Sequence, residues 1–170
     1  MRQRVLLVGL MASGKSTIGH ALCELTGWRE IDNDMLLKDM CGMTASELSR
    51  AQGEARLRQA ESDVLHRVLE MDPPLVAGVA AGAVLDPGDR ERLREADHVV
   101  WLKPSLETIV GRVADQPHRP WVSQDPDGVI REMARIRYPL YDKVADQVLD
   151  LDELTPSQAA RVIVAELDEA

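Results

Sequence analysis

One short stretch, GLMASGKST at positions 9–17, constrains the fold more strongly than any other part of the chain. It follows an aliphatic run, VLLV at positions 5–8, that is typical of a buried strand. After it, apolar residues spaced three and four apart, from Ile18 to Leu25, indicate an amphipathic helix that stops at Gly27. A strand, a turn of the form G-x-x-x-x-G-K-[ST] and a helix together predict a phosphate-binding loop on an α/β sheet.

The residue types in this loop suit a nucleoside triphosphate. Gly9 leaves the strand and Gly14 permits the turn, so that successive backbone N–H groups can point into one anion-sized hollow. Lys15 would reach the β- and γ-phosphates, and the Ser16 hydroxyl would be a ligand of Mg²⁺. The alternative, an ordinary glycine turn with a surface lysine, needs a chance match with odds of roughly one in a few hundred. We therefore expect ATP and Mg²⁺ to be held by Gly9, Ala12, Ser13, Gly14, Lys15, Ser16 and Thr17.

Strand-like and helix-like segments alternate along the whole chain. The predicted strands cover residues 5–9, 28–32, 75–79, 98–102 and 146–151. The predicted helices cover residues 15–27, 33–42, 44–53, 54–71, 89–97, 105–115, 129–145 and 155–167, with a break near Pro139. Thr44 and Glu47 predict a capping box. No composition shift or repeat divides the chain, so we expect one doubly wound α/β domain with a parallel sheet over residues 1–170.

The composition argues against several classes of function. The net charge of −9 disfavours nucleic acid as a partner, because such binding needs positive charge to neutralise phosphates. Lys15 interrupts the apolar run near the N-terminus, which therefore predicts neither a signal peptide nor a membrane span. Cys23 and Cys41 are too few for a disulfide framework and lack metal-ligand spacing. We expect a reduced, cytoplasmic protein that binds neither nucleic acid nor membrane.

Two carboxylates end the second predicted strand. In an open α/β sheet, ligands bind at the carboxyl ends of the strands, where IDNDM places Asp32 and Asp34. One could serve magnesium and the other a hydroxyl group. The alternative is that Asp34 merely caps the following helix, since aspartate is a common cap. The third and fourth strands end without a carboxylate, which favours Asp32 as the acidic group beside the metal.

Four arginines outside the loop are candidates for anion binding. Arg58 lies on the long predicted helix, where the alternative is an exposed salt bridge with Glu54 or Glu61 at helical spacing. Arg112 ends a helix, Arg119 lies in a proline-rich loop, and Arg137 precedes the sequence YPLY. Each alone is typical of a solvated charge. Phosphoryl transfer nevertheless needs cations over the transferred group, and a loop that bears an arginine is one way to supply them.

With these motifs together, the sequence resembles the shikimate kinase family almost from end to end. GKSTIG followed by IDNDM corresponds to the family's P-loop and its D-x-D motif. GEARLRQAE is similar to its G-E-x-x-F-R-x-x-E motif, with Leu57 in place of the aromatic residue. HRPWV is similar to its lid motif R-P-L, and RIRYPLYDKVA to its R-x-x-x-Y-x-x-x-A motif. The resemblance implies a P-loop three-layer sandwich with five parallel strands, a mobile lid at about 115–127 and acceptor-binding helices at about 33–62.

The resemblance also implies a reaction and roles on the nucleotide side. The reaction is transfer of a phosphoryl group from ATP to the 3-hydroxyl of shikimate, by a cytoplasmic monomer of aromatic amino-acid biosynthesis. Lys15 and Ser16 would hold the phosphates and Mg²⁺, and Asp32 would reach the metal through water. Arg112 and the segment near Pro156 would line the adenine.

On the acceptor side, the resemblance implies that Asp34 binds the hydroxyl and acts as its base or orienter. Arg58 and Arg137 would clamp the substrate carboxylate, with Glu61 positioning Arg58. Arg119 would close over the phosphates, so that Lys15, Asp34 and Arg119 are the expected catalytic residues. Paired arginines suit a carboxylate because each offers a planar fork of donors.

The chain departs from the family pattern after its third predicted strand. Where the family has three consecutive glycines against the bound acid, this chain has Ala80, Ala81 and Gly82. Alanine cannot adopt a positive φ without a cost of about 1–2 kcal/mol, and its methyl group occupies space. This departure keeps open a kinase of a related cyclitol or hydroxy acid. A separate alternative is a regulatory homologue that binds ATP without catalysis, against which the intact lysine and acidic pair argue.

Overall fold

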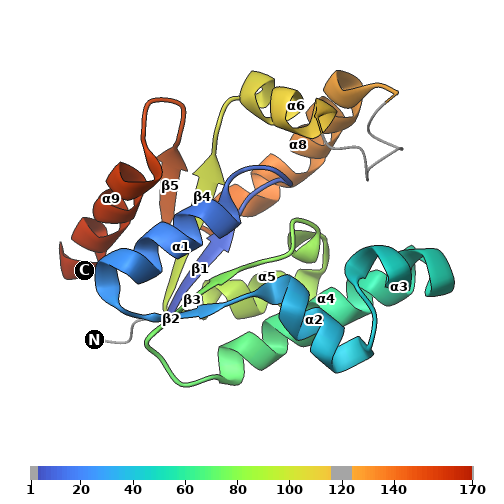
Figure 1. Cartoon of the computed structure of the whole chain (residues 1–170), viewed down its shortest axis with the longest axis horizontal. Helices are drawn as coiled ribbons and strands as arrows, with labels where there is room; N and C mark the ends of the chain where they lie inside the picture. The colour runs from blue at the N-terminus through green and yellow to red at the C-terminus, as the bar shows by residue number, and fades with distance from the viewer. Residues whose placement is uncertain (1–3, 116–123, 170) are drawn as a thin grey trace.

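The computed structural model describes residues 4–115 and 124–169. Its sheet is fully parallel and has the order β2-β3-β1-β4-β5, with strands β1 (Arg4–Val8), β2 (Arg29–Ile31), β3 (Leu75–Gly78), β4 (His98–Lys103) and β5 (Gln147–Asp150). The helices are α1 (Lys15–Thr26), α2 (Asn33–Cys41), α3 (Ala45–Gln52), α4 (Glu54–Glu70), α5 (Pro87–Arg94), α6 (Leu106–Ala114), α8 (Pro126–Asp142) and α9 (Pro156–Glu169) (Figure 1). The predicted fold class is confirmed. Within the described residues, no helix is both long and apolar enough to cross a membrane.

Helices cover both faces of the sheet, because the central strands carry apolar side chains on both sides. Helices α1 and α9 pack on one face against Val5 and Leu7 of β1 (Figure 1). Helices α4, α5, α6 and α8 contribute to the core on the other face, around Leu6 and Val8. Strand β1 is buried between β3 and β4, so the loop that follows it opens at the centre of the sheet's carboxyl edge.

A third, smaller core lies apart from these two layers. It joins α2, α3 and the first half of α4 through the buried residues Leu37, Leu48, Ala60 and Val64. We call it the α2–α4 cluster. Figure 1 shows these helices gathered at one end of the molecule, away from β5 and α9. Helix α4 belongs to both parts, since Leu65 and Val68 on the same helix enter the main core.

Local sequence signals account for most element boundaries. Gly27 and Gly42 end their helices in the left-handed conformation that favours glycine. The predicted capping box at the start of α3 is present in full. Thr155 accepts a hydrogen bond from the Gln158 backbone N–H at 3.2 Å and so caps α9.

Two predicted boundaries are wrong. Helix α8 runs through Pro139 without a break. Pro139 and Arg135 are both exposed, so the Arg135 carbonyl, which loses its helical partner, can bond water. Pro126 and Asp127, predicted to lie in the lid, form the first turn of α8 under the cap of Asp125, whose side chain accepts from the Gly128 N–H. Most of the predicted lid, including Arg119, lies outside the described residues.

Candidate active site

The loop between β1 and α1 has the backbone geometry of an anion cradle. Gly9, Ala12 and Gly14 all have positive φ, at 150°, 58° and 104°. A β-carbon at Gly9 would lie 2.7 Å from the Leu102 carbonyl oxygen, so only glycine fits there. Ala12 is the one non-glycine residue with a positive φ in the described part of the chain. The loop therefore stores some backbone strain at a position where glycine would be relaxed.

Lys15 and Arg112 brace this loop. The Lys15 ammonium group donates hydrogen bonds to the carbonyl oxygens of Gly9 and Leu10, each at 2.9 Å. Arg112, on the last turn of α6, donates to the Ala12 carbonyl oxygen at 2.9 Å. Two cations thus lie beside the loop, where a polyphosphate would bring negative charge.

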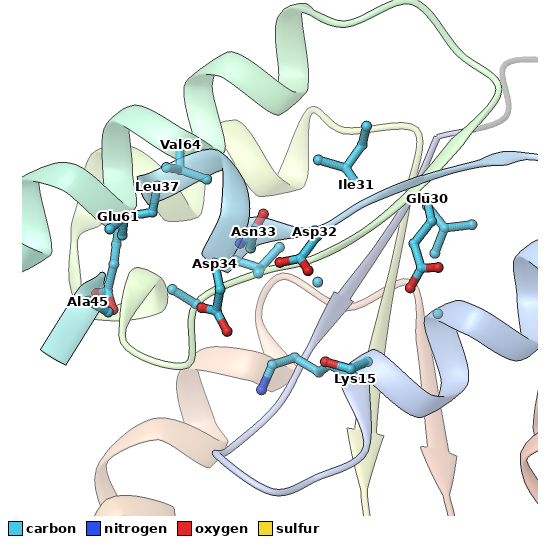
Figure 2. A pocket seen from close by; sticks show the side chains of 16 residues that line it. Lys15, Glu30, Ile31, Asp32, Asn33, Asp34, Leu37, Ala45, Glu61 and Val64 are labelled. Atoms are coloured by element: carbon cyan, nitrogen blue, oxygen red, sulfur yellow. The ribbon is translucent and has the colours of Figure 1, made fainter. Parts of the chain in front are cut away.

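A cavity of about 180 Å³ opens beside the loop, at the carboxyl edge of the sheet. Lys15 and Ser16 line it from α1, Asp32 and Asp34 from the start of α2, and Glu61 from α4. Figure 2 shows Asp34 and Lys15 extending from different elements toward the same space. The remaining wall is largely apolar and comes from Ile31, Leu37, Ala45, Val64, Val76, Gly78, Val79 and Ala80, with Gly19, Glu30 and Asn33. The cavity therefore joins polar groups at the loop to an apolar wall at the α2–α4 cluster.

The two aspartates that end the second strand have different local roles. Asp32 is the cap of α2, and its Oδ1 accepts a hydrogen bond from the Met35 backbone N–H at 3.0 Å. The alternative that Asp34 caps this helix is therefore wrong, because Asp34 lies within its first turn. The Asp34 side chain is directed into the cavity instead (Figure 2).

Arg58 is held in place by two carboxylates. It donates to Glu61 at 2.6 Å and to Glu54 at 2.7 Å, so both predicted salt bridges exist. Burial lowers the pKa of the Arg58 guanidinium, but the carboxylates of Glu61 and Glu54 outweigh it, and the net pKa is raised. Glu61 lines the cavity. Arg58 is thus attached to the wall of the cavity through Glu61, although its own side chain is not part of the lining.

The backbone from Ala80 to Gly82 shows why this chain can have two alanines where the family has glycines. Neither alanine has a positive φ, so neither carries the strain that glycine would relieve. Gly82 has a φ of −91°, yet a β-carbon there would lie 2.6 Å from Cζ of Arg58. An alanine at position 82 would therefore displace the guanidinium end of Arg58, whereas positions 80 and 81 accept alanine. Ala80 lines the cavity.

Sequence reasoning missed one polar contact of this segment. The Tyr141 hydroxyl donates a hydrogen bond to the Ala81 carbonyl oxygen at 2.7 Å. Tyr141 follows Arg137 by one helical turn on α8, and both are buried. The available signal was the R-x-x-x-Y spacing, which places the two side chains on one face of a helix.

The predicted site residues do not all meet in one cavity. Lys15, Ser16, Asp32, Asp34 and Ala80 line it together. Thr17 is exposed on α1, and Pro156 is exposed at the start of α9. The apolar wall from Leu37, Ala45 and Val64 was not predicted to face a ligand, because its spacing is also that of an ordinary helix core.

Comparison with known proteins decides the family. A sequence model described as shikimate kinase matches residues 11–168. A shikimate kinase of Xanthomonas campestris is 37% identical over 164 residues, which cover 96% of this chain and 91% of the relative. One from Paramagnetospirillum magneticum is 34% identical over 160 residues, covering 94% of this chain and 82% of the relative. The chain belongs to the shikimate kinase family.

The structural comparison agrees with this membership. The structure of shikimate kinase from Acinetobacter baumannii in complex with shikimate has a TM-score of 0.91 and 28% sequence identity. The match covers 98% of this chain and 93% of that chain. As a member of the shikimate kinase family, the chain is a phosphotransferase that uses ATP and acts on a hydroxyl acceptor.

Proposed function

We propose that this protein transfers the γ-phosphoryl group of ATP to the 3-hydroxyl of shikimate, giving shikimate 3-phosphate and ADP. The observation that carries the proposal is the shared cavity, in which Lys15 and Ser16 of the phosphate loop face Asp34 and Glu61. A phosphoryl donor bound on the loop and a hydroxyl acceptor bound at the α2–α4 cluster would meet there. Relatives named shikimate kinase that align along nearly the whole chain support the choice of acceptor.

In the proposed reaction, the residues of the cavity act by position and charge. Asp34 would orient the acceptor hydroxyl and take its proton as the oxygen bonds to the γ-phosphorus. The bond from that phosphorus to the bridging oxygen breaks, and ADP leaves. The Lys15 ammonium would exchange its carbonyl partners at Gly9 and Leu10 for phosphate oxygens and neutralise charge on the transferred group. Arg119 remains a predicted catalytic residue, outside the described residues.

The oxygen donors beside the loop fit Mg²⁺. Ser16 offers a hydroxyl and Asp32 a carboxylate, both residues line the same cavity, and Mg²⁺ prefers oxygen ligands. A single protein carboxylate is enough, because this ion is usually bound by one or two carboxylates together with substrate phosphates and water. The metal would neutralise negative charge on the phosphates.

Recognition of an acidic acceptor would depend on Arg58 and Arg137. The protein carries a net charge of −9, so an acid needs local positive charge to enter. Arg58 is fixed by two carboxylates, which leaves its remaining donors in a defined direction. Arg137 is buried on α8 and is 8% exposed, which lets it attract a carboxylate with little screening. Arg112 and the segment near Pro156 remain the proposed adenine contacts.

The test is an ADP-release assay with shikimate as the acceptor. We expect shikimate to raise ADP release well above the ATPase background and Lys15→Ala to abolish the increase, with the fold intact by circular dichroism. Lys143→Ala, on the exposed end of α8, is the matched control and should leave turnover unchanged. Turnover only with a related cyclitol or hydroxy acid would replace shikimate as the acceptor. ATP binding without any acceptor-stimulated release would instead identify a regulatory homologue. The protein is further proposed to be cytoplasmic and monomeric. Analytical ultracentrifugation would check the monomeric state.

A further inference from the structure

One buried hydroxyl is not used by the reaction described above. Tyr141 on α8 is fully buried, and its O–H donates to the Ala81 carbonyl oxygen at 2.7 Å across a sequence separation of 60 residues. Its ring packs against Trp101 of β4, with the ring centres 5.7 Å apart. Burial raises the pKa of the Tyr141 hydroxyl, so the group stays protonated and remains a donor over the range of pH in which enzymes work. Tyr141 therefore fixes one point of the chain just after β3.

The residue after that fixed point touches Arg58. The guanidinium of Arg58 lies so close to Gly82 that a β-carbon there would collide with its Cζ and Nη1 atoms. On its other side, Arg58 is drawn to Glu61 and Glu54 of its own helix. The guanidinium is thus confined between the carboxylates of α4 and the backbone of Gly82. Any shift of the Ala81–Gly82 backbone changes the space that Arg58 occupies.

The same hydroxyl also lies near the second arginine. Burial raises the pKa of Tyr141, and it outweighs the charge of Arg137, a hydrogen bond with the Arg137 side chain and, more weakly, the charge of Arg58, which all lower that pKa. Arg137 lies one turn before Tyr141 on α8, so the hydrogen bond to Ala81 ties the helix that carries Arg137 to the segment that confines Arg58. Helices α4 and α8 are far apart in sequence, and the short 3₁₀ helix η1 (Ala83–Leu85), which follows Gly82, contacts both of them.

We propose that Tyr141 is a positioning residue for acceptor binding: its hydrogen bond to the Ala81 carbonyl sets the placement of Arg58 relative to Arg137, and thereby the affinity for the acid acceptor. The inference rests on the proposed function, because it assigns these two arginines to the carboxylate of the acceptor. Tyr141 itself touches neither the carboxylate nor the transferred group in this role. It acts through the backbone of Ala81 and Gly82.

The test compares Tyr141→Phe with Tyr138→Phe. Tyr138 is one turn from the exposed end of the same helix, and its ring centre lies 6.5 Å from that of Tyr141. Tyr138→Phe is therefore a matched control that also removes one hydroxyl. We expect Tyr141→Phe to raise the KM for shikimate about 3- to 10-fold, the range that loss of one hydrogen bond supports. Its kcat and its KM for ATP should stay within about twofold, and Tyr138→Phe should change none of the three. Calorimetric titration with shikimate should show the same loss of affinity without turnover.

A second variant keeps the proposal testable if Tyr141→Phe is poorly stable. Gly82→Ala displaces the flexible end of Arg58 directly and should also raise the KM for shikimate. In the double variant, the two increases should combine to much less than their product, because both act on the same placement of Arg58. Independent, fully multiplying effects would overturn the proposal. So would a lower melting temperature of Tyr141→Phe with an unchanged KM for shikimate. An unaltered protein that neither binds nor phosphorylates shikimate would instead refute the proposed function.

Discussion

Three alanine-to-glycine substitutions should change stability with opposite signs. Ala12 has a φ of 58°, whereas Ala80 and Ala81 have no positive φ. Replacing Ala12 by glycine should stabilise the protein, and replacing Ala80 or Ala81 should destabilise it. The chemical change is identical in all three cases, so the sign depends on the backbone alone.

The magnitude follows from two opposing effects. An alanine in the left-handed region costs about 1–2 kcal/mol, which glycine removes. Glycine also makes the unfolded chain more flexible, and this lowers stability by about 0.4–1 kcal/mol at a position that alanine fits without strain. At the middle of these ranges, Ala12→Gly should therefore raise the free energy of unfolding by about 0.8 kcal/mol, and each of the other two should lower it by about 0.4–1 kcal/mol. In a domain of this size, 1 kcal/mol corresponds to about 2–4 °C in Tm.

Urea denaturation followed by circular dichroism measures these differences, with thermal melts as a second readout. The slope of the urea transition should stay constant among the three variants, which would show that only stability has changed. The same sign of change in all three variants would refute the reasoning.

Three further predictions concern the site and the pH dependence. Asp34→Asn should lower kcat by about 10²- to 10⁴-fold, with a KM for ATP within about twofold of the parent. An equal loss of turnover and of ATP affinity would show that Asp34 is structural. Asp39→Asn on the same helix is the control. Gly9→Ala should abolish ATP binding in calorimetric titration, because its β-carbon would meet the Leu102 carbonyl oxygen at 2.7 Å. The backbone N–H of Thr44 holds the pKa of Glu47 below its usual value of 4.5. The ionised Glu47 carboxylate therefore stabilises the fold above pH 4.5, and this stabilisation is lost as the pH falls through the lowered pKa. Tm measured from about pH 6 to about pH 3 should fall less steeply in Glu47→Gln, and parallel curves would contradict this assignment.

Local signals in the sequence predicted the fold well. The strand, loop and helix around residues 5–27 and the capping box at Thr44 depend on neighbours within a few positions, so the chain alone specifies them. The continuation of α8 through Pro139 could not be predicted. The free-energy cost of a proline inside a helix depends on whether water reaches the Arg135 carbonyl, which is a property of the folded surface. The sequence could not decide whether Asp32 or Asp34 caps α2, because the two aspartates are two positions apart. The point at which β2 ends decides this, and it makes Asp32 the cap.

Long-range contacts account for what could not be predicted at the site. The cavity residues of the phosphate loop and the D-x-D motif were predicted and lie together. The close approach of Arg58 to Gly82 could not be predicted, because Arg58 comes from α4, more than 20 residues earlier in the chain. The partner of the Tyr141 hydroxyl, Ala81, is 60 residues away and was equally hidden.

The α2–α4 cluster also bears on how such a chain can diverge. Its small core, made of Leu37, Leu48, Ala60 and Val64, is separate from the layers that hold the sheet and the phosphate loop. Substitutions in that core can reshape the apolar wall of the cavity while leaving the nucleotide end intact. Selection can therefore change acceptor binding and ATP binding almost independently. Helix α4 must be kept for both, because it belongs to the cluster and to the main core. A library randomised within the cluster should yield folded ATP-binding variants far more often than one randomised in β1 or the loop that follows it.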